Sequence, residues 1–264
     1  MLLRQFRLHT NYSLLMPYDQ HPDLLTPIED TVLWRYMDFA RFLYLLEMKC
    51  LWFARADQFG DPLESMLTDA EIQEFEREVI LNSVSTRGKQ PWLLSSELMR
   101  STAYFSCWRA KPNESLAMWD LYGKGNGIIG IKSTVGQLKR AVKVHPEAVY
   151  ITLVEYIDWS QRGRYHNTLV RSARKDLSYE HEAELRAIIW PSKLATEHQR
   201  AIQQGQQPPE TPLGISVPIE PGALIREVVV GPREQPWVYE LVDRVMKRYA
   251  LNVLLSRSDR LTKR

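Results

Sequence analysis

The chain of 264 residues contains only two cysteines, Cys50 and Cys107, which are too few for a disulfide framework. Both lie among apolar residues, which is typical of small buried side chains in a reducing compartment. No stretch approaches the roughly 18 to 20 consecutive apolar residues that a membrane-spanning helix needs. The N-terminus also has no apolar run followed by a small-residue cleavage site. These absences predict a cytoplasmic protein with no membrane partner.

A strong excess of charge of either sign is lacking too. The chain has 34 lysines and arginines against 32 aspartates and glutamates, a formal net charge of +2. So small an excess gives no indication of nucleic acid or another polyanion as a partner. The basic residues between Arg244 and Arg264 are typical of a solvated helix face and a frayed terminus.

The motifs of several enzyme classes are missing. No H-x-x-x-H, no C-x-x-C and no pair of histidines at ligand spacing occurs, so no metal cofactor is predicted. There is no G-x-S-x-G elbow, no Walker sequence and no set of kinase motifs. The glycine-rich run 123–127 lies between a predicted helix and a predicted strand, where glycines form turns, whereas nucleotide fingerprints follow a strand.

The hydrophobic share of 44% is enough for one core in a chain of this length. Residues 1–30 are predicted to be an irregular N-terminal extension because three prolines interrupt them. Residues 31–264 are predicted to form a single domain. Within it, the Gln- and Pro-rich run 198–212 is predicted to be an exposed loop.

Short apolar or alternating segments predict strands, and longer segments with apolar residues three or four apart predict helices. Strands are expected at 31–36, 50–55, 103–108, 128–133, 149–157, 180–189, 224–230 and 252–257. Helices are expected after the N-cap residue Asp38, at 69–84, 91–101, 114–122 and 236–250, and in the polar run that ends at Asp176. Because strands and helices alternate without a regular βαβ rhythm, we predict an α+β fold with a mixed, largely antiparallel sheet flanked by helices.

The most regular charge pattern lies in residues 178–186. Glu180, Glu182, Glu184 and Arg186 occupy every second position, which is typical of a strand with one wet face. On such a strand the carboxylates of Glu182 and Glu184 would point the same way, roughly 7 Å apart. Two interpretations remain open: a solvated edge strand that Arg186 neutralises, or a carboxylate pair at the lip of a cleft.

Two further polar residues interrupt apolar strands. Arg35 is either an outward-facing side chain whose stem lies on its neighbours, or a guanidinium that binds phosphate oxygens in a cleft. Ser106 is the one strongly polar residue inside its strand. A buried serine is usually satisfied by the backbone, and a ligand contact is the alternative.

Several blocks of the sequence, in order, resemble a bacterial family known only as domain of unknown function 2971. They are Leu33–Tyr36, Phe59–Glu64, Ser106–Trp108, Glu114–Ser115 with Met118–Trp119 and Tyr122, Glu180–Arg186 and Leu224–Pro232. The resemblance runs from about Val32 to the C-terminus, and it implies no activity.

The order of Arg35, Ser106 and a Glu-x-Glu pair also resembles ADP-ribosyltransferases of the arginine-serine-glutamate type. This resemblance implies an ADP-ribosyltransferase-like fold with NAD as substrate. It places Arg35 at the phosphates or ribose of NAD and Ser106 at the nicotinamide side of the pocket. Glu184 would bind the ribose beside the scissile bond, and Glu182 would assist the acceptor. The chain departs from the family where a cysteine and a tryptophan follow the serine, and where a leucine and an arginine follow the glutamates.

The function implied is cleavage of the nicotinamide–ribose bond of NAD, with transfer to an unknown acceptor or to water. A carboxylate fixed beside the ribose would stabilise the positive charge that develops there. The rings of four aromatic residues could stack on nicotinamide or adenine, although most must also serve the core. These residues are Tyr36, Trp108, Trp119 and Tyr122.

Two alternatives stay open. The first is a non-catalytic nucleotide-binding or regulatory module, in which Arg186 pairs with the carboxylates and neutralises their charge. The second is a metal-dependent phosphodiesterase, in which Asp57, Asp61 and Glu64 join the acidic strand to hold Mg²⁺. Acidic residues next to glycine and proline are more often turn formers, which argues against the second.

Overall fold

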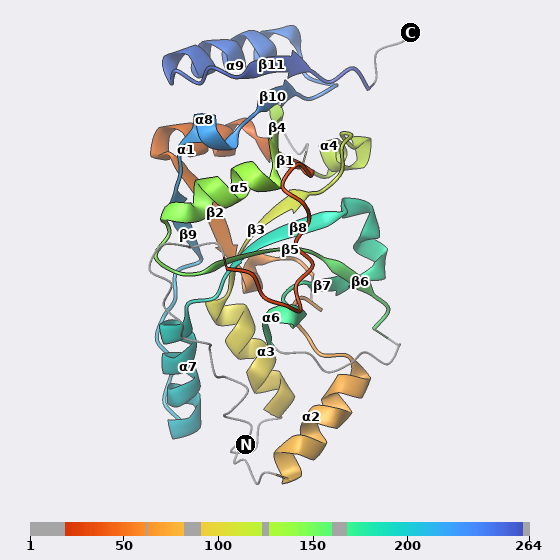
Figure 1. The fold of residues 1–264 in the computed structure, drawn as a ribbon, viewed down its shortest axis with the longest axis vertical. Coiled ribbons are helices and arrows are strands. Elements are labelled where there is room, and N and C mark those ends of the chain that lie inside the picture. Colours follow the sequence, from red (N-terminus) through yellow and green to blue (C-terminus); the bar gives the residue numbers. More distant parts are fainter. Residues whose placement is uncertain (1–18, 62, 82–90, 123–126, 160–167, 261–264) are drawn as a thin grey trace.

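A computed structural model describes residues 19–61, 63–81, 91–122, 127–159 and 168–260. Within these ranges the fold is α+β, with nine strands in one mostly antiparallel sheet and a separate two-stranded sheet. The predicted class is therefore confirmed. Figure 1 shows α9 and β11 at one end of the long axis, and α2, α3 and α7 at the other. In the described part of the chain, no helix combines the length and the apolar character needed to cross a membrane.

The helices are α1 (Phe39–Met48), α2 (Asp69–Leu81), α3 (Pro91–Thr102), α4 (Leu116–Tyr122), α5 (Val135–Ala141), α6 (Thr168–Arg171), α7 (Ser192–Gln204), α8 (Pro221–Leu224) and α9 (Pro236–Arg248). Short 3-10 helices are η2 (Ala56–Gln58), η3 (Val142–Val144) and η4 (Leu177–Glu182). The strands are β1 (Val32–Asp38), β2 (Cys50–Arg55), β3 (Tyr104–Arg109), β4 (Ile128–Thr134), β5 (Val149–Leu153), β6 (Glu155–Ile157), β7 (Arg174–Asp176), β8 (Glu184–Ile189), β9 (Gly214–Pro218), β10 (Glu227–Val230) and β11 (Leu254–Arg257).

The main sheet has the order β11-β10-β4-β1-β3-β2-β9, and β8 pairs with both β3 and β5. Its two faces bury different hydrophobic clusters because successive side chains of a strand point to opposite sides. Leu33, Trp108 and Leu185 belong to the larger cluster, whereas Phe105 and Ile188 belong to a cluster on the opposite face.

The strand β3 changes its neighbour along one edge. Its first residues, Tyr104 and Phe105, pair with β2, whereas its last residue, Arg109, pairs with Trp34 of β1. Between these points, residues 106–108 have no ladder partner on this edge within the described ranges. The sheet therefore opens between β1 and β2, and α1, which connects these strands, contacts both of them.

Local signals at both ends of α1 explain where β1 and β2 end and begin. The carboxylate of Asp38 accepts a hydrogen bond of 2.7 Å from the backbone N–H of Arg41, which is an N-cap. Lys49 has a φ of 45°, in the left-handed region that commonly ends a helix. The backbone is then free to enter β2 at Cys50, as the sequence predicted.

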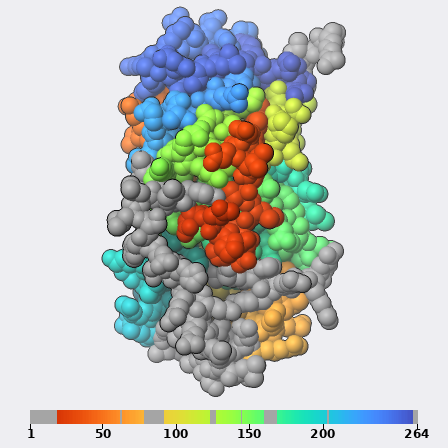
Figure 2. Space-filling model, in the orientation of Figure 1, coloured from red at the N-terminus to blue at the C-terminus, as the bar shows by residue number. Residues whose placement is uncertain are grey.

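Residues 19–31 form turns along the surface beside β5 and α5, as Figure 2 shows in red. The backbone N–H of Asp19 donates to the carbonyl of Val149, and the N–H of Leu153 donates to that of Leu25. These bonds attach this segment to the edge of β5. The rest of the predicted N-terminal extension lies outside the described residues.

The acidic stretch is not the single strand that the alternation predicts. Its first part forms the 3-10 helix η4, which ends at Ala183 with a φ of 44°. The strand β8 begins only at Glu184, and all six of its residues are buried. The prediction of a strand with one wet face was therefore wrong, because a helical turn followed by a strand buried on both faces produced the same pattern of charges.

Other boundaries differ from the prediction as well, and the elements α5, α7, α8 and β9 were not expected from the sequence. The segment 149–157 is divided at Val154, whose N–H donates to the carbonyl of Glu184, so β5 and β6 belong to different sheets. The run before Asp176 holds one helical turn, α6, and the strand β7 in its described part. The predicted loop 198–212 begins with the second half of α7, and Gly205 ends that helix with a φ of 68°.

Gly130 on β4 offers a test of the packing around α4. A Cβ atom at this position would lie 2.8 Å from Cη2 of Trp119, which is closer than real Cβ contacts. We expect Gly130→Ala to destabilise the fold by about 1–3 kcal/mol, because overpacking forces neighbouring side chains to move. Urea unfolding measures the change. The control is Gly60→Ala, whose Cβ would meet nothing within 4 Å, and an equal loss in both variants would contradict the packing argument.

Candidate functional site

Arg35 lies where the sheet opens. Its Nη1 donates to the hydroxyl oxygen of Ser106, and its Nη2 donates to the carbonyl of Trp52 at 3.3 Å. The guanidinium carbon is 5.7 Å from the ring centre of Trp108. Within the described ranges no carboxylate forms an ion pair with Arg35, and burial lowers the pKa of this guanidinium. A partly buried cation that has no counter-ion in the described residues favours an incoming anion.

Ser106 is fully buried, and its hydroxyl oxygen accepts a hydrogen bond from Arg35. Its hydroxyl oxygen also accepts a hydrogen bond of 3.2 Å from the indole N–H of Trp108. Ser106 pairs with Ala187 of β8, whereas Glu184 pairs with Arg109, so the alternation of β3 points Ser106 and Glu184 to opposite faces. The structure thus brings Ser106 to Arg35 and not to Glu184.

Cys107 links the two faces of the site, and the sequence interpretation overlooked it. Its side chain lies on the same face of the sheet as Glu184, close enough for the two groups to influence each other's pKa. Burial raises the pKa of this thiol well above its usual value, and the charge of Glu184 raises it further, whereas Arg186 and Arg35 act in the opposite direction. Arg35 and Glu184 therefore both act electrostatically on one side chain. The signal in the sequence was the position next to Ser106, which must face the other way on a strand.

Glu184 is buried and held by three N–H donors. Its Oε1 accepts from Nε of Arg186 at 2.8 Å, and its Oε2 accepts from Nη2 of Arg186 at 3.2 Å and from Nζ of Lys175 at 3.3 Å. Its backbone N–H donates to the hydroxyl of Tyr156 at 2.7 Å. Burial by itself would raise the pKa of Glu184, but Arg186 and Lys175 outweigh it and hold the pKa at about 2. The carboxylate is therefore ionised at neutral pH.

Arg186 is fully buried and donates to two carboxylates at once. Besides Glu184, its Nη2 donates to Oε2 of Glu64 at 3.0 Å, and its Nη1 donates to Oε1 of Glu64 and to the carbonyl of Ser172 at 2.6 Å. Of the two interpretations of the acidic stretch, the pairing with Arg186 is observed. It occurs in the interior, however, and not on a solvated edge.

Glu182 and Glu184 meet although they do not share a strand. The ammonium group of Lys175 on β7 pairs with both carboxylates, and it also lies 4.5 Å from the ring centre of Tyr179. Tertiary contacts with Lys175, not strand alternation, therefore bring the two glutamates together.

The four predicted aromatic residues differ in what they can contact. The rings of Trp108 and Trp119 are only 2% and 3% exposed, so both are core residues. Tyr36 stacks on Tyr122 with 6.5 Å between ring centres and 18° between planes. Tyr122 is 37% exposed, and its pKa is raised to about 12 by burial and by the charges of Cys107, Glu182 and Glu184. Tyr122 is thus the ring of this set that a ligand can reach.

The acidic loop does not have the arrangement that a magnesium site requires. Asp57 pairs with Arg55 at 2.8 Å, and Oδ1 of Asp61 accepts a hydrogen bond from the backbone of Leu63. Arg186 lies between Glu64 and Glu184, in the position that a shared cation would need. In the described part of the chain, no three His, Cys, Asp or Glu side chains are grouped to hold a metal ion.

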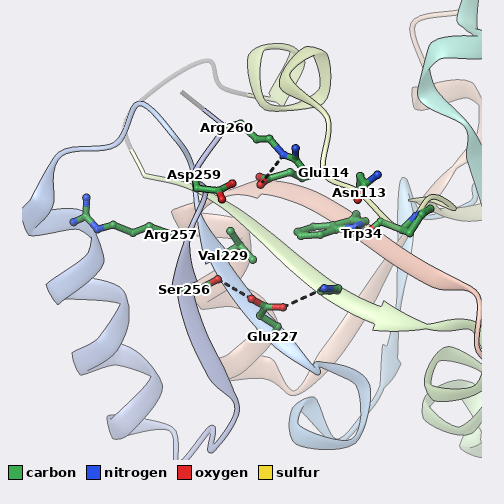
Figure 3. Close-up of a pocket in the computed structure, with 11 residues that line it drawn as sticks. Trp34, Asn113, Glu114, Glu227, Val229, Ser256, Arg257, Asp259 and Arg260 are labelled. Atoms are coloured by element: carbon green, nitrogen blue, oxygen red, sulfur yellow. Dashed lines mark hydrogen bonds and ion pairs between the residues drawn. The ribbon is translucent and has the colours of Figure 1, made fainter. Parts of the chain in front are cut away.

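A cavity of about 260 Å³ lies away from these residues, between β1, β11 and the loop that precedes α4 (Figure 3). Four of its charged side chains form ion pairs: Lys132 with Glu227 at 3.3 Å, and Arg260 with Glu114 at 3.2 Å. Neither Arg35 nor Glu184 lines it. Of the predicted site residues, Arg35, Glu184 and Tyr122 instead interact electrostatically with Cys107.

Comparison with known proteins adds three solved structures. The chain is similar to DarT of Thermus sp. 2.9 in complex with NAD+, at 11% identity and a TM-score of 0.38, over 88% of this chain and 98% of that one. The same protein in complex with carba-NAD+ gives 12% identity and a TM-score of 0.36, over 88% and 96% of the two chains. In complex with ADP-ribosylated ssDNA it gives 13% identity and a TM-score of 0.36, over 89% and 97%. At these values no residue of this chain is assigned by superposition.

No family model matches the chain, and no curated protein matches it either. The resemblance to domain of unknown function 2971 therefore stays a prediction.

Proposed function

We propose that the chain binds NAD where the sheet opens between β1 and β2, and that it cleaves the nicotinamide–ribose bond. The observation that supports this most is the pair of opposite charges that act on Cys107. The charges of two residues act on its thiol: Arg35, a partly buried cation without an anionic partner in the described residues, and Glu184, a carboxylate held ionised. A fixed cation suits the pyrophosphate of NAD, and a fixed anion suits the charge that develops on its ribose.

The reaction needs charge stabilisation more than proton transfer. As the bond between the ribose carbon and the nicotinamide nitrogen breaks, its electron pair moves to the ring nitrogen and nicotinamide leaves as a neutral molecule. Positive charge develops on the ribose, and the carboxylate of Glu184 stabilises it. Water or an acceptor hydroxyl, amine or amide then bonds to the ribose carbon and loses a proton.

The geometry favours a positioning role for Ser106 over a contact with nicotinamide. Its hydroxyl oxygen accepts from both Arg35 and Trp108, so it fixes the direction of the guanidinium. Because Ser106 faces away from Glu184, the residue beside the carboxylate on β3 is Cys107. In this arrangement Tyr122 provides the accessible ring next to the scissile bond.

A second candidate is a nucleotide-binding module without catalysis. Its support is that Arg186 and Lys175 already occupy both oxygens of Glu184. Titration calorimetry with NAD, followed by chromatography of the ligand, separates the two candidates. Binding followed by recovery of intact NAD favours the module, whereas release of nicotinamide favours the enzyme.

Arg35→Lys tests the proposed phosphate contact. Lysine keeps the positive charge but loses the planar fork that donates to two oxygens at once. We expect the Kd for NAD to rise about 10- to 100-fold, which corresponds to the loss of one charged hydrogen bond. The control is Arg140→Lys on α5, which is 65% exposed and should leave the Kd unchanged. An unchanged Kd in the Arg35 variant would remove this residue from the binding site.

A further inference from the structure

Five charged side chains form one connected buried cluster around Glu184. The ion pairs run from Glu64 to Arg186, on to Glu184, then to Lys175 and Glu182, and none of the four is longer than 3.3 Å. No side chain of the five is more than 12% exposed. Three carboxylates and two cations leave the cluster with one negative charge.

We infer that Glu64 and Glu182 are charge-compensating residues. They neutralise Arg186 and Lys175, so that Glu184 keeps a net negative charge for the substrate. This inference rests on the proposed function, and it assigns both residues as positioning residues that act through the two cations. It also explains how a carboxylate with three N–H donors can still stabilise a developing cation.

The contacts of Glu64 fit this role. Both of its oxygens accept hydrogen bonds from Arg186, as expected of an ionised carboxylate that receives a bidentate guanidinium. Burial raises the pKa of Glu64, and the charge of Arg186 opposes that rise. Without Glu64, Glu184 would be the only carboxylate paired with Arg186. The net charge of Glu184 and Arg186 together would then be zero.

The contact of Glu182 differs from the role that the sequence resemblance implies. Its carboxylate pairs with Lys175, the same cation that pairs with Glu184. If Glu182 acts by neutralising Lys175, its effect on the reaction must disappear when Lys175 carries no charge. A residue that assists the acceptor directly would be needed whether or not Lys175 is charged.

The neighbouring cation Arg174 pairs with carboxylates outside the cluster. Arg174 on the same strand as Lys175 pairs with Glu71 at 2.6 Å and with Glu155 at 3.3 Å, and neither of these carboxylates pairs with a member of the cluster within the described ranges. On the substrate side, Glu184 faces Cys107, which the charge of Arg35 also reaches.

The test compares Glu182→Gln, Lys175→Met and the double variant in the full chain. We expect Glu182→Gln to lower kcat for nicotinamide release about tenfold or more with KM little changed, because the cluster becomes neutral. The double variant again carries one negative charge, and its kcat should return to within about threefold of the wild type. If the double variant stays as slow as Glu182→Gln, the inference is overturned and Glu182 acts directly.

A second readout does not depend on turnover. In a Cys50→Ala background, the rate at which iodoacetamide alkylates Cys107 at mildly alkaline pH reports the electrostatic potential beside Glu184. The alkylation rate should rise in Glu182→Gln, because a less negative cluster lowers the pKa of the thiol. In the double variant the rate should return to that of the wild type. Glu71→Gln, which removes a buried carboxylate of another ion pair, should leave it unchanged.

The two readouts separate the two ideas. A wild-type chain that binds NAD but releases no nicotinamide would end the proposed function, and the alkylation rates would still decide the charge balance. Alkylation rates that are equal in all variants would overturn charge compensation even if nicotinamide is released.

Discussion

Replacing Glu184 by glutamine is expected to lower the rate of nicotinamide release from NAD by about 100- to 1000-fold, the usual cost of losing one fixed electrostatic group in an active site. The amide has nearly the same shape as the carboxylate but carries no charge to stabilise the ribose cation. Because the proposed phosphate contact is made by Arg35, the Kd for NAD should change little. Single-turnover assays of nicotinamide release, combined with calorimetry, measure the two quantities separately.

The control for this variant must allow for lost stability. Glutamine at position 184 leaves Arg186 without one of its two carboxylates in a fully buried site, so the fold itself is weakened. Glu71→Gln has the same kind of effect, since Glu71 is fully buried and paired with Arg174 at 2.6 Å. Both variants should lose stability, but only Glu184→Gln should lose turnover below its melting temperature. Wild-type turnover in Glu184→Gln would remove this residue from the mechanism and leave the binding module.

Local signals predicted most of the fold because they act within a few residues. The N-cap at Asp38, the apolar stripe that follows it and the β-forming run from Cys50 define β1, α1 and β2 in the sequence as they do in the structure. Apolar spacing also predicted the helix α9, but through Trp237, Leu241, Val245 and Tyr249. The residues that the structure buries are instead Val238, Val242 and Met246. One of the places where the prediction failed is 180–189. The alternation of charges there was real, but Ala183 in the left-handed region divides a helical turn from a buried strand.

The candidate site was predicted less well because its contacts join distant parts of the chain. Arg35 and Ser106 were recognised as polar interruptions of apolar strands, and they do meet across 71 positions of sequence. Glu64 and Arg186 are 122 positions apart, and no local pattern indicates that one guanidinium will be shared by two buried carboxylates. The direction in which each residue of β3 faces depends on its pairing with β8, which is a tertiary property.

Replacing Arg186 by methionine is expected to destabilise the fold by about 3–5 kcal/mol at neutral pH. Methionine fills much of the same space, but Glu64 loses both of its hydrogen bonds to Arg186, and the carboxylate of Glu184 keeps its bond to Lys175. Urea unfolding measures the loss. Arg233→Met is the control, because its ion pair with Asp120 is exposed and such pairs contribute at most about 1 kcal/mol.

The wild type and Arg186→Met should differ in their free energy of unfolding, and the pH dependence of that difference is a sharper test than its size. In the wild type, the pKa of Glu184 is about 2, below its value in the unfolded chain, so its contribution is present above the unfolded pKa and is lost as the pH falls toward 2. In Arg186→Met the main cause of that low pKa is removed, and protonation relieves the buried charge that the substitution leaves behind. The gap in the free energy of unfolding should therefore be widest near neutral pH and should narrow steadily below about pH 4.5. A gap of constant size across this range would mean that Arg186 stabilises the fold by packing and not by holding two carboxylates in their ionised form.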